Sequence, residues 1–140
     1  MKKIAVVYWS MTGNTKAMAD AVVSGGQKAG AEVDLFEAAD FNADKLDAYD
    51  AIGFGCPAMG AEVLEEEEFD PMFTACESKL SGKKIALFGS YDWGDGEWMR
   101  IWEQGCKDAG ANLACDFVIC NLEPDSEGIA ACEALGAALV

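Results

Sequence analysis

The strongest constraint on the fold is that short apolar runs alternate with longer stretches of helical periodicity. Such runs are typical of strands buried on both faces of a parallel sheet, and they occupy residues 4–9, 33–36, 51–56, 85–90 and 113–120. Helices are predicted over residues 15–29, 65–79, 97–109 and 126–139, with a short irregular or helical link over 41–46. This alternation predicts a doubly wound three-layer α/β fold with a five-stranded parallel sheet in the order 2-1-3-4-5.

The length of 140 residues suits one domain over residues 1–140, because it allows one full core and is short for two. Local signals set the expected ends of the helices. Gly30 and Gly110 suit helix stops, and Ser126 is expected to cap the last helix. Pro71 must lie near the start of the helix predicted over 65–79 or kink it.

The predicted topology locates the ligand site before any motif is considered. In sheets of this order, ligands bind beyond the carboxyl ends of the strands, where the winding reverses between strands 1 and 3. The site should therefore be built from the loops that follow strands 1, 3 and 4, over residues 10–15, 57–62 and 90–96.

The first loop, Ser10-Met11-Thr12-Gly13-Asn14-Thr15, has the layout of a phosphate site. It follows a buried strand and opens a helix, so that backbone N–H groups, hydroxyls and the helix N-terminus can meet an anion. It lacks the Gly-Lys-Ser/Thr ending of a P-loop and the G-x-G-x-x-G of a dinucleotide site. Without a basic residue in the run, a phosphate would be held by dipoles and hydroxyls; a plain turn and helix cap is the simpler alternative.

The other two loops carry large apolar groups in turn-like contexts. Met59 and Glu62 offer a thioether and a carboxylate, and Trp93 offers an indole between small residues. A phosphate cradle, a thioether and an indole at one edge describe a slot for a flat aromatic phosphate.

These three stretches, residues 10–15, 59–66 and 87–96, resemble the short-chain flavodoxins of the clostridial and Megasphaera kind. The resemblance covers the whole chain in order and spacing. It implies noncovalent binding of FMN and a role as a low-potential one-electron carrier, with a stabilised neutral semiquinone, that replaces ferredoxin between redox enzymes. No positioned nucleophile, general base or substrate pocket is evident beside the expected flavin, which favours a carrier with no substrate turnover of its own over an enzyme.

The resemblance also implies roles for individual residues. The hydroxyls and amide of Ser10, Thr12, Asn14 and Thr15, with the backbone amides of Met11 and Gly13, would bind the FMN phosphate. Met59 and Trp93 would cover the two faces of the flavin, Glu62 would accept from flavin N3–H, and Ser90, Asp92 and Gly94 would lie along the ribityl and pyrimidine edge. The full predicted cofactor set is Ser10, Met11, Thr12, Gly13, Asn14, Thr15, Pro57, Ala58, Met59, Gly60, Ala61, Glu62, Ser90, Tyr91, Asp92, Trp93 and Gly94.

Two residues depart from the pattern of the resemblance. Ala61 stands where the family usually has Gly, Asp or Asn, and the peptide flip that the family uses at Gly60 needs positive φ at the position of Ala61, which costs alanine roughly 1 kcal/mol. Asp92 stands where glycine is common, and its charge should disfavour the anionic, fully reduced flavin. We expect Ala61 to weaken the flipped state and with it the semiquinone, and unchanged potentials in Ala61→Gly would contradict this. We expect Asp92→Gly to raise the second reduction potential, and a failure to raise it would contradict the second hypothesis.

Charge limits the partners. With 10 Lys and Arg against 25 Asp and Glu, the formal charge of -15 argues against nucleic acid and anionic membrane. Basic surfaces of redox partner proteins remain attractive, and the acidic run Glu65, Glu66, Glu67 and Glu68, with Asp70, would be their docking face; a merely solvated helix start is the alternative. A monomer is expected.

The six cysteines form no C-x-x-C, and histidine is absent, so no zinc or iron–sulfur pattern is present. Buried free thiols in a reducing cytoplasm are expected. The first apolar run begins directly after Lys3, so neither a signal peptide nor a transmembrane span is predicted.

Three other functions are alternatives to an electron carrier. An FMN-dependent NAD(P)H or quinone-type oxidoreductase of the same fold would need a nicotinamide site, and no basic patch or extra loop for one is visible. A phosphoacceptor receiver domain would need acidic residues where Ser10, Met11 and Cys56 stand. A non-redox partner-binding domain would bind no flavin.

Overall fold

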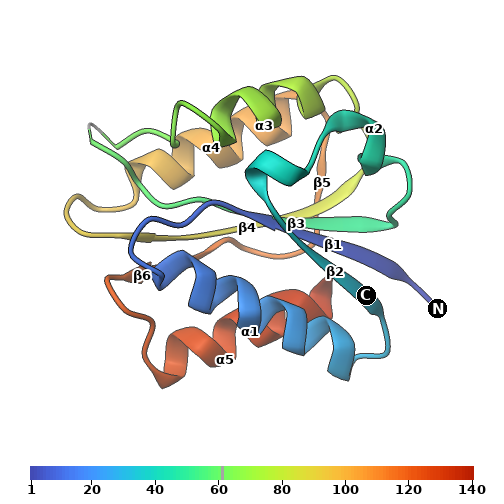
Figure 1. Ribbon diagram of the computed structural model, residues 1–140, viewed down its shortest axis with the longest axis horizontal. Helices are drawn as coiled ribbons and strands as arrows, with labels where there is room; N and C mark the ends of the chain where they lie inside the picture. The colour runs from blue at the N-terminus through green and yellow to red at the C-terminus, as the bar shows by residue number, and fades with distance from the viewer. Residues whose placement is uncertain (61) are drawn as a thin grey trace.

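The fold is a parallel sheet covered by helices on both faces (Figure 1). The computed structural model describes residues 1–60 and 62–140. The strands are β1 (Lys3–Tyr8), β2 (Glu32–Glu37), β3 (Ala51–Gly55), β4 (Lys84–Tyr91), β5 (Asn112–Leu113) and β6 (Val118–Asn121). Their order is β2-β1-β3-β4-β5, with β6 also paired to β4. The predicted order 2-1-3-4-5 is confirmed.

The run predicted as a single fifth strand is divided into β5 and β6, and both pair with β4. Leu113 lies opposite Ile85 and Val118 opposite Phe88. The chain between these two positions is therefore two residues longer than the facing part of β4. The chain leaves the ladder between them and returns. This break could not be predicted from the sequence, because the residues on both sides of it are apolar and only the pairing partner reveals the register.

Two helix pairs form the outer layers. The helices are α1 (Asn14–Lys28), α2 (Ala43–Leu46), α3 (Phe69–Glu77), α4 (Glu97–Asp108) and α5 (Ser126–Ala138), with a short 3₁₀ turn η1 (Ala38–Asp40). Figure 1 shows α1 and α5 on one face of the sheet and α3 and α4 on the other. Separate apolar clusters fill the space between the sheet and each pair. Among the described residues, no helix combines the length and apolar character that crossing a membrane requires.

Glycines allow α1 and α5 to approach closely. A Cβ on Gly25 would lie 1.9 Å from the Glu133 carbonyl oxygen, and one on Gly136 would lie 2.1 Å from that of Val22. Either methyl group would force the helices apart, so the backbone contact depends on the missing side chains.

Helix α3 begins at Phe69, four residues later than the predicted start at Glu65. The acidic run therefore lies before the helix, and Pro71 occupies the first turn, where a missing N–H costs nothing. Glu65 is buried, and its carboxylate accepts hydrogen bonds at 2.8 Å from the backbone N–H groups of Glu67, Glu68 and Phe69. Because Glu65 caps the helix from the inside, its predicted place on an exposed docking face is wrong.

The cap of α5 also differs from the prediction. Asp125, and not Ser126, occupies the N-cap position, and its carboxylate accepts from the Gly128 N–H at 2.8 Å. Both residues are good caps by type. The sequence alone could not decide between neighbours, since helix ends are uncertain by one or two residues.

Candidate functional site

The three predicted loops meet at the carboxyl edge of the sheet and enclose two adjoining cavities. The first is lined by Ser10, Met11, Thr12, Asn14, Thr15, Pro57, Ala58, Met59, Ser90, Tyr91 and Asp92. The second is lined by Met11, Ala58, Met59, Gly60, Glu62, Asp92 and Trp93. Four residues line both, so the two form one continuous hollow, which we call the edge cavity. Of the predicted cofactor set, Gly13 and Gly94 lie beside it, and Ala61 is outside the described residues.

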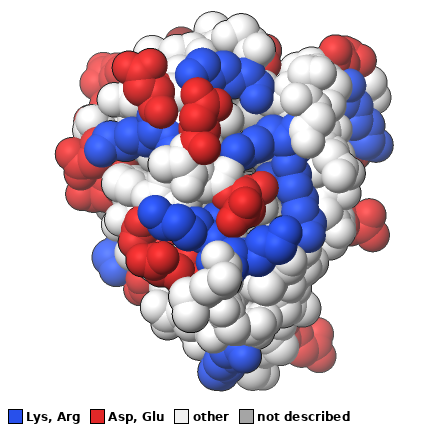
Figure 2. Space-filling model, turned by 90° about the vertical axis from the view of Figure 1, so that its right-hand side faces the viewer, with Lys and Arg blue, Asp and Glu red and all other residues white. Residues whose placement is uncertain are grey.

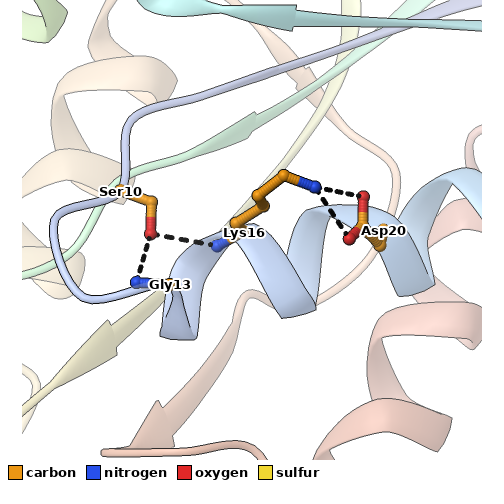
Figure 3. Close-up of polar contacts among 4 residues, drawn as sticks. All are labelled: Ser10, Gly13, Lys16 and Asp20. Atoms are coloured by element: carbon orange, nitrogen blue, oxygen red, sulfur yellow. Dashed lines mark hydrogen bonds and ion pairs between the residues drawn. The ribbon is translucent and has the colours of Figure 1, made fainter.

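The first loop turns at Gly13, whose φ of 99° is the left-handed conformation that favours glycine. The Ser10 hydroxyl oxygen accepts from the backbone N–H groups of Gly13 at 3.1 Å and Lys16 at 3.2 Å (Figure 3). These bonds hold the loop against the first turn of α1. The Gly13 N–H was predicted to bind phosphate. To do so, it would have to release the Ser10 hydroxyl oxygen and donate to the ligand instead.

A basic residue directly follows the first loop, although the loop itself contains none. Lys16 is in the first turn of α1, and its ammonium group pairs with the Asp20 carboxylate at 3.1 Å (Figure 3). The Asp20 hydrogen bond and charge raise the pKa of Lys16. The first turn of α1 contains no acidic residue, so its partial positive charge is not neutralised from within the helix.

Two hydroxyls join the first and third loops below the cavity. Thr15 and Ser90 are both buried, and their hydroxyl oxygens lie 2.8 Å apart. Each was predicted to bind a different part of the ligand. In the structure each also satisfies the other, which fixes the distance between α1 and the end of β4.

The second loop is a tight turn between Met59 and Val63, which exchange backbone hydrogen bonds of 2.8 and 3.1 Å. Gly60 has a φ of 47° and Glu62 a φ of 55°. Positive φ at a glutamate is uncommon and marks a residue whose place is fixed by its surroundings. The expected strain at Ala61 stays a prediction, since that residue is outside the described part of the chain.

The left-handed turn brings the Glu62 carboxylate against the third loop. A Cβ on Gly94 would lie 2.2 Å from Glu62 Oε1, so the carboxylate occupies the space beside this glycine. This oxygen is buried, and it has no hydrogen-bond partner among the described residues. A buried acceptor without a donor is costly, and a ligand N–H at this edge of the cavity would satisfy it. The N3–H of a flavin pyrimidine ring is a donor of this kind, so the unpartnered Glu62 oxygen suits a flavin.

Large apolar side chains stand exposed around the same edge. Trp93 is 62% exposed and Met11 66%, while Met59 is half-buried. An indole and two thioethers at the mouth of a polar cavity provide cover for a planar aromatic ring.

Asn121 supports the third loop and was not identified from the sequence. Its side-chain amide donates to the carbonyl oxygens of Tyr91 at 3.1 Å and Asp92 at 3.2 Å, and the Leu122 N–H donates to the same Tyr91 oxygen at 2.8 Å. Only the pairing of β6 with β4 brings Asn121 to this position. The one signal in the sequence that could have identified Asn121 is its position directly after an apolar run, where a strand reaches the carboxyl edge of the sheet.

The Cys56 thiol is structural. Burial raises the pKa of the Cys56 thiol, which accepts from the Glu65 N–H at 3.4 Å and directly follows β3. The six cysteines are free, and all but Cys115 are buried, as predicted. A neutral, buried Cys56 does not act as a nucleophile.

Comparison with known proteins decides the family. The family model described as Flavodoxin matches residues 6–136. The chain belongs to the flavodoxin family. It is 46% identical to the flavodoxin of Megasphaera elsdenii over 88% of this chain and 89% of that protein, and 46% identical to the flavodoxin of Clostridium beijerinckii over 86% and 87% of the two chains.

The fold agrees with this assignment. The solution structure of two-electron reduced Megasphaera elsdenii flavodoxin matches with a TM-score of 0.90 and 45% identity over 97% of both chains. Flavodoxins are electron carriers that bind FMN, and the edge cavity, with its hydroxyl loop, aromatic cover and unpaired Glu62 oxygen, suits that cofactor. The resemblance seen in the sequence is confirmed, and the comparisons do not support the alternative oxidoreductase.

Proposed function

We propose that this protein carries single electrons at low potential between redox enzymes, with FMN held noncovalently in the edge cavity, and that it turns over no substrate of its own. The observation that carries the proposal is the buried, unpartnered Glu62 Oε1 at the wall of a cavity lined by hydroxyls and apolar side chains. When bound, FMN supplies the electron-accepting ring.

The residues of the chain supply binding and orientation. Ser10, Thr12 and Thr15 line the first cavity from the loop that opens α1, where phosphate is favoured by the helix dipole. Glu62 fixes the orientation of the ring by accepting an N–H at the far wall. Met59 and Trp93 exclude water from its faces.

Charge around the cavity disfavours additional electrons on the ring. Between Lys45 and Lys79 the chain has no basic residue, and this interval contains the whole second loop and the acidic run. The opposite end of the molecule differs: Figure 2 shows Lys and Arg side chains there, interspersed with Asp and Glu, and Lys3 and Lys84 begin β1 and β4 at that end. The cavity end is therefore the more negative end of the molecule. A flavin ring bound there would take up an additional negative charge less readily.

The same polarity supports basic redox partners. Glu66, Glu67, Glu68 and Asp70 are exposed, and none of the ion pairs among the described residues involves them. Uncompensated carboxylates beside the cavity speed encounter with a basic protein and orient it. The proposed docking face consists of these four residues, without the buried Glu65. The six free thiols favour a cytoplasmic location.

An anaerobic reductive titration of the FMN-loaded protein tests the carrier proposal. Two separated one-electron steps are expected, with the long-wavelength absorption of one-electron-reduced flavin rising and then falling. Direct reduction by two electrons, or oxidation of NAD(P)H by the pure protein, would contradict it. Glu62→Gln should retain FMN and shift the second step, because the acceptor is kept and the negative charge removed.

The docking face has its own test. Electron transfer to a small basic haem protein should slow with rising salt. The triple change of Glu66, Glu67 and Glu68 to Gln should weaken this salt dependence, while changing Glu32, Glu37 and Glu77 to Gln, which removes equal charge elsewhere, should leave most of it. Equal effects of the two triple changes would reject this face.

A further inference from the structure

A second hollow, separate from the edge cavity, lies between the second loop and helix α4. It has a volume of about 360 Å³ and is lined by Glu62, Val63, Leu64, Glu66, Asp70, Trp98, Ile101 and Trp102. We call it the α4 groove. Its floor is made by the rings of Trp98 and Trp102, which are buried. A volume of this size admits an aliphatic or aromatic side chain.

The walls of the α4 groove are unusually apolar for an exposed position. Ile101 is 63% exposed and Val63 40%, although the chain as a whole is strongly acidic. The other exposed side chains of α4 are polar or charged (Glu97, Arg100, Gln104, Lys107 and Asp108), so the exposure of Ile101 is not a consequence of a generally apolar helix. Exposed apolar side chains gathered over a hollow mark contact sites more often than scattered ones do.

One polar group in this wall has no partner. The indole N–H of Trp98 donates to the Cys56 carbonyl oxygen at 3.3 Å. The indole N–H of Trp102 has no acceptor among the described residues, even though Trp102 is only 5% exposed. Its ring is fixed edge-on against Phe69 and Phe73 of α3. The two helices thus present a rigid floor that need not rearrange to accept a side chain.

The rim of the α4 groove is acidic. Glu66 and Asp70 line it, both are exposed, and neither belongs to an ion pair among the described residues. Arg100, in the first half of α4, is paired to Asp95 at 3.0 Å, so its charge is already compensated. An apolar hollow with free carboxylates at its rim is complementary to an apolar side chain flanked by lysine or arginine.

The groove and the edge cavity share one residue. Glu62 lines both, so it separates a guest in the groove from a ligand in the cavity. Contact at the α4 groove would therefore bring a partner protein to the wall of the electron-carrying site. A redox partner needs this proximity, whereas a non-redox partner does not.

We propose that the α4 groove is the anchoring point for a basic redox partner, which inserts one apolar side chain flanked by lysine or arginine. The proposal rests on the proposed function and adds the partner's chemistry to it. The apolar anchor supplies affinity, because burying an aliphatic side chain removes apolar surface from water. The carboxylates of Glu66 and Asp70 supply orientation.

Two end-blocked pentapeptides test the proposal: Lys-Lys-Leu-Lys-Lys and its matched control Lys-Lys-Ala-Lys-Lys. Binding is followed in the FMN-loaded protein by the NMR signal of the Trp102 indole N–H, which is assigned with Trp102→Phe. The leucine peptide should bind about tenfold more tightly and move this signal, since leucine buries more apolar surface than alanine. Ile101→Gln should remove the preference, while Leu35→Gln, a change of another exposed apolar residue on β2, should retain it.

The rim is tested in the same way. Glu66→Gln combined with Asp70→Asn should weaken both peptides equally, and Glu77→Gln at the other end of α3 should weaken them less. Equal affinity of the two peptides, or a leucine preference that survives Ile101→Gln, would overturn the proposal. Failure of the proposed function is distinguishable, because FMN retention and the reductive titration are measured on the same sample without peptide.

Discussion

The hydroxyl oxygens of Thr15 and Ser90 lie 2.8 Å apart and are buried, so that one hydrogen bond joins the start of α1 to the end of β4. These two residues are 75 positions apart in the sequence. Their contact sets the spacing between the loop expected to bind phosphate and the loop expected to line the flavin.

Thr15→Val tests this contact. Valine keeps the shape of threonine and leaves the buried Ser90 hydroxyl without its partner, so the free energy of unfolding should fall by about 1–2 kcal/mol. FMN affinity should fall as well, because the two loops lose their fixed spacing. Denaturant unfolding and FMN titration measure the two effects. Thr74→Val is the control, since Thr74 is exposed and bonded only to Asp70 in its own helix.

Glu65→Gln tests the internal cap of α3. Burial raises the pKa of Glu65, but the three backbone N–H bonds from Phe69, Glu68 and Glu67 outweigh it, so that the pKa in the folded protein is lowered. A lowered folded pKa means that the ionised group stabilises the fold above the pKa of the unfolded chain, and that this stability is lost as the pH falls through the folded value.

We therefore expect Glu65→Gln to cost about 1–2 kcal/mol at neutral pH, because a neutral amide oxygen is a weaker acceptor for three N–H groups. The difference from the wild type should shrink in acid, below the folded pKa. Denaturant unfolding across this range measures it, with Glu66→Gln as the exposed control. A difference that stays constant with pH would show that Glu65 is not ionised in the folded protein.

Some features of the fold and of the site could be predicted from the sequence, and others could not. The apolar runs and the edge loops were predictable, because burial on both faces and turn composition are local properties. The division between β5 and β6, the inward turn of Glu65 and the support given by Asn121 depend on contacts with distant strands or loops. No local pattern encodes such contacts. Glu65 is indistinguishable from Glu66, Glu67 and Glu68 in the sequence, yet it alone is buried.

Lys16 should contribute to phosphate binding although it lies outside the predicted loop. Its charge in the first turn of α1 attracts the FMN phosphate, while its pair with Asp20 draws the ammonium group along the helix. Lys16→Gln should weaken FMN binding about threefold and reduce its salt dependence, and Asp20→Asn should strengthen binding.

Riboflavin provides the internal control for Lys16. Since it lacks the phosphate, its affinity should be the same in wild type, Lys16→Gln and Asp20→Asn. Lys28→Gln removes the same charge at the other end of α1, where Lys28 pairs with Glu133, and should change neither affinity. Parallel losses for FMN and riboflavin would assign Lys16 a purely structural role.

Gly94→Ala tests the contact that positions the Glu62 carboxylate. The added methyl group would lie 2.2 Å from Glu62 Oε1, and Gly94 has a φ of 89°, so alanine adds both a clash and backbone strain. Gly82→Ala is the matched control, because Gly82 has a φ of 75° and no atom within 4 Å of an added Cβ. Both changes should lower the free energy of unfolding by about 1 kcal/mol through strain alone. Only Gly94→Ala should also displace Glu62, weaken FMN binding and shift the reduction potentials; if Gly82→Ala does the same, the effect comes from strain and not from the displaced carboxylate.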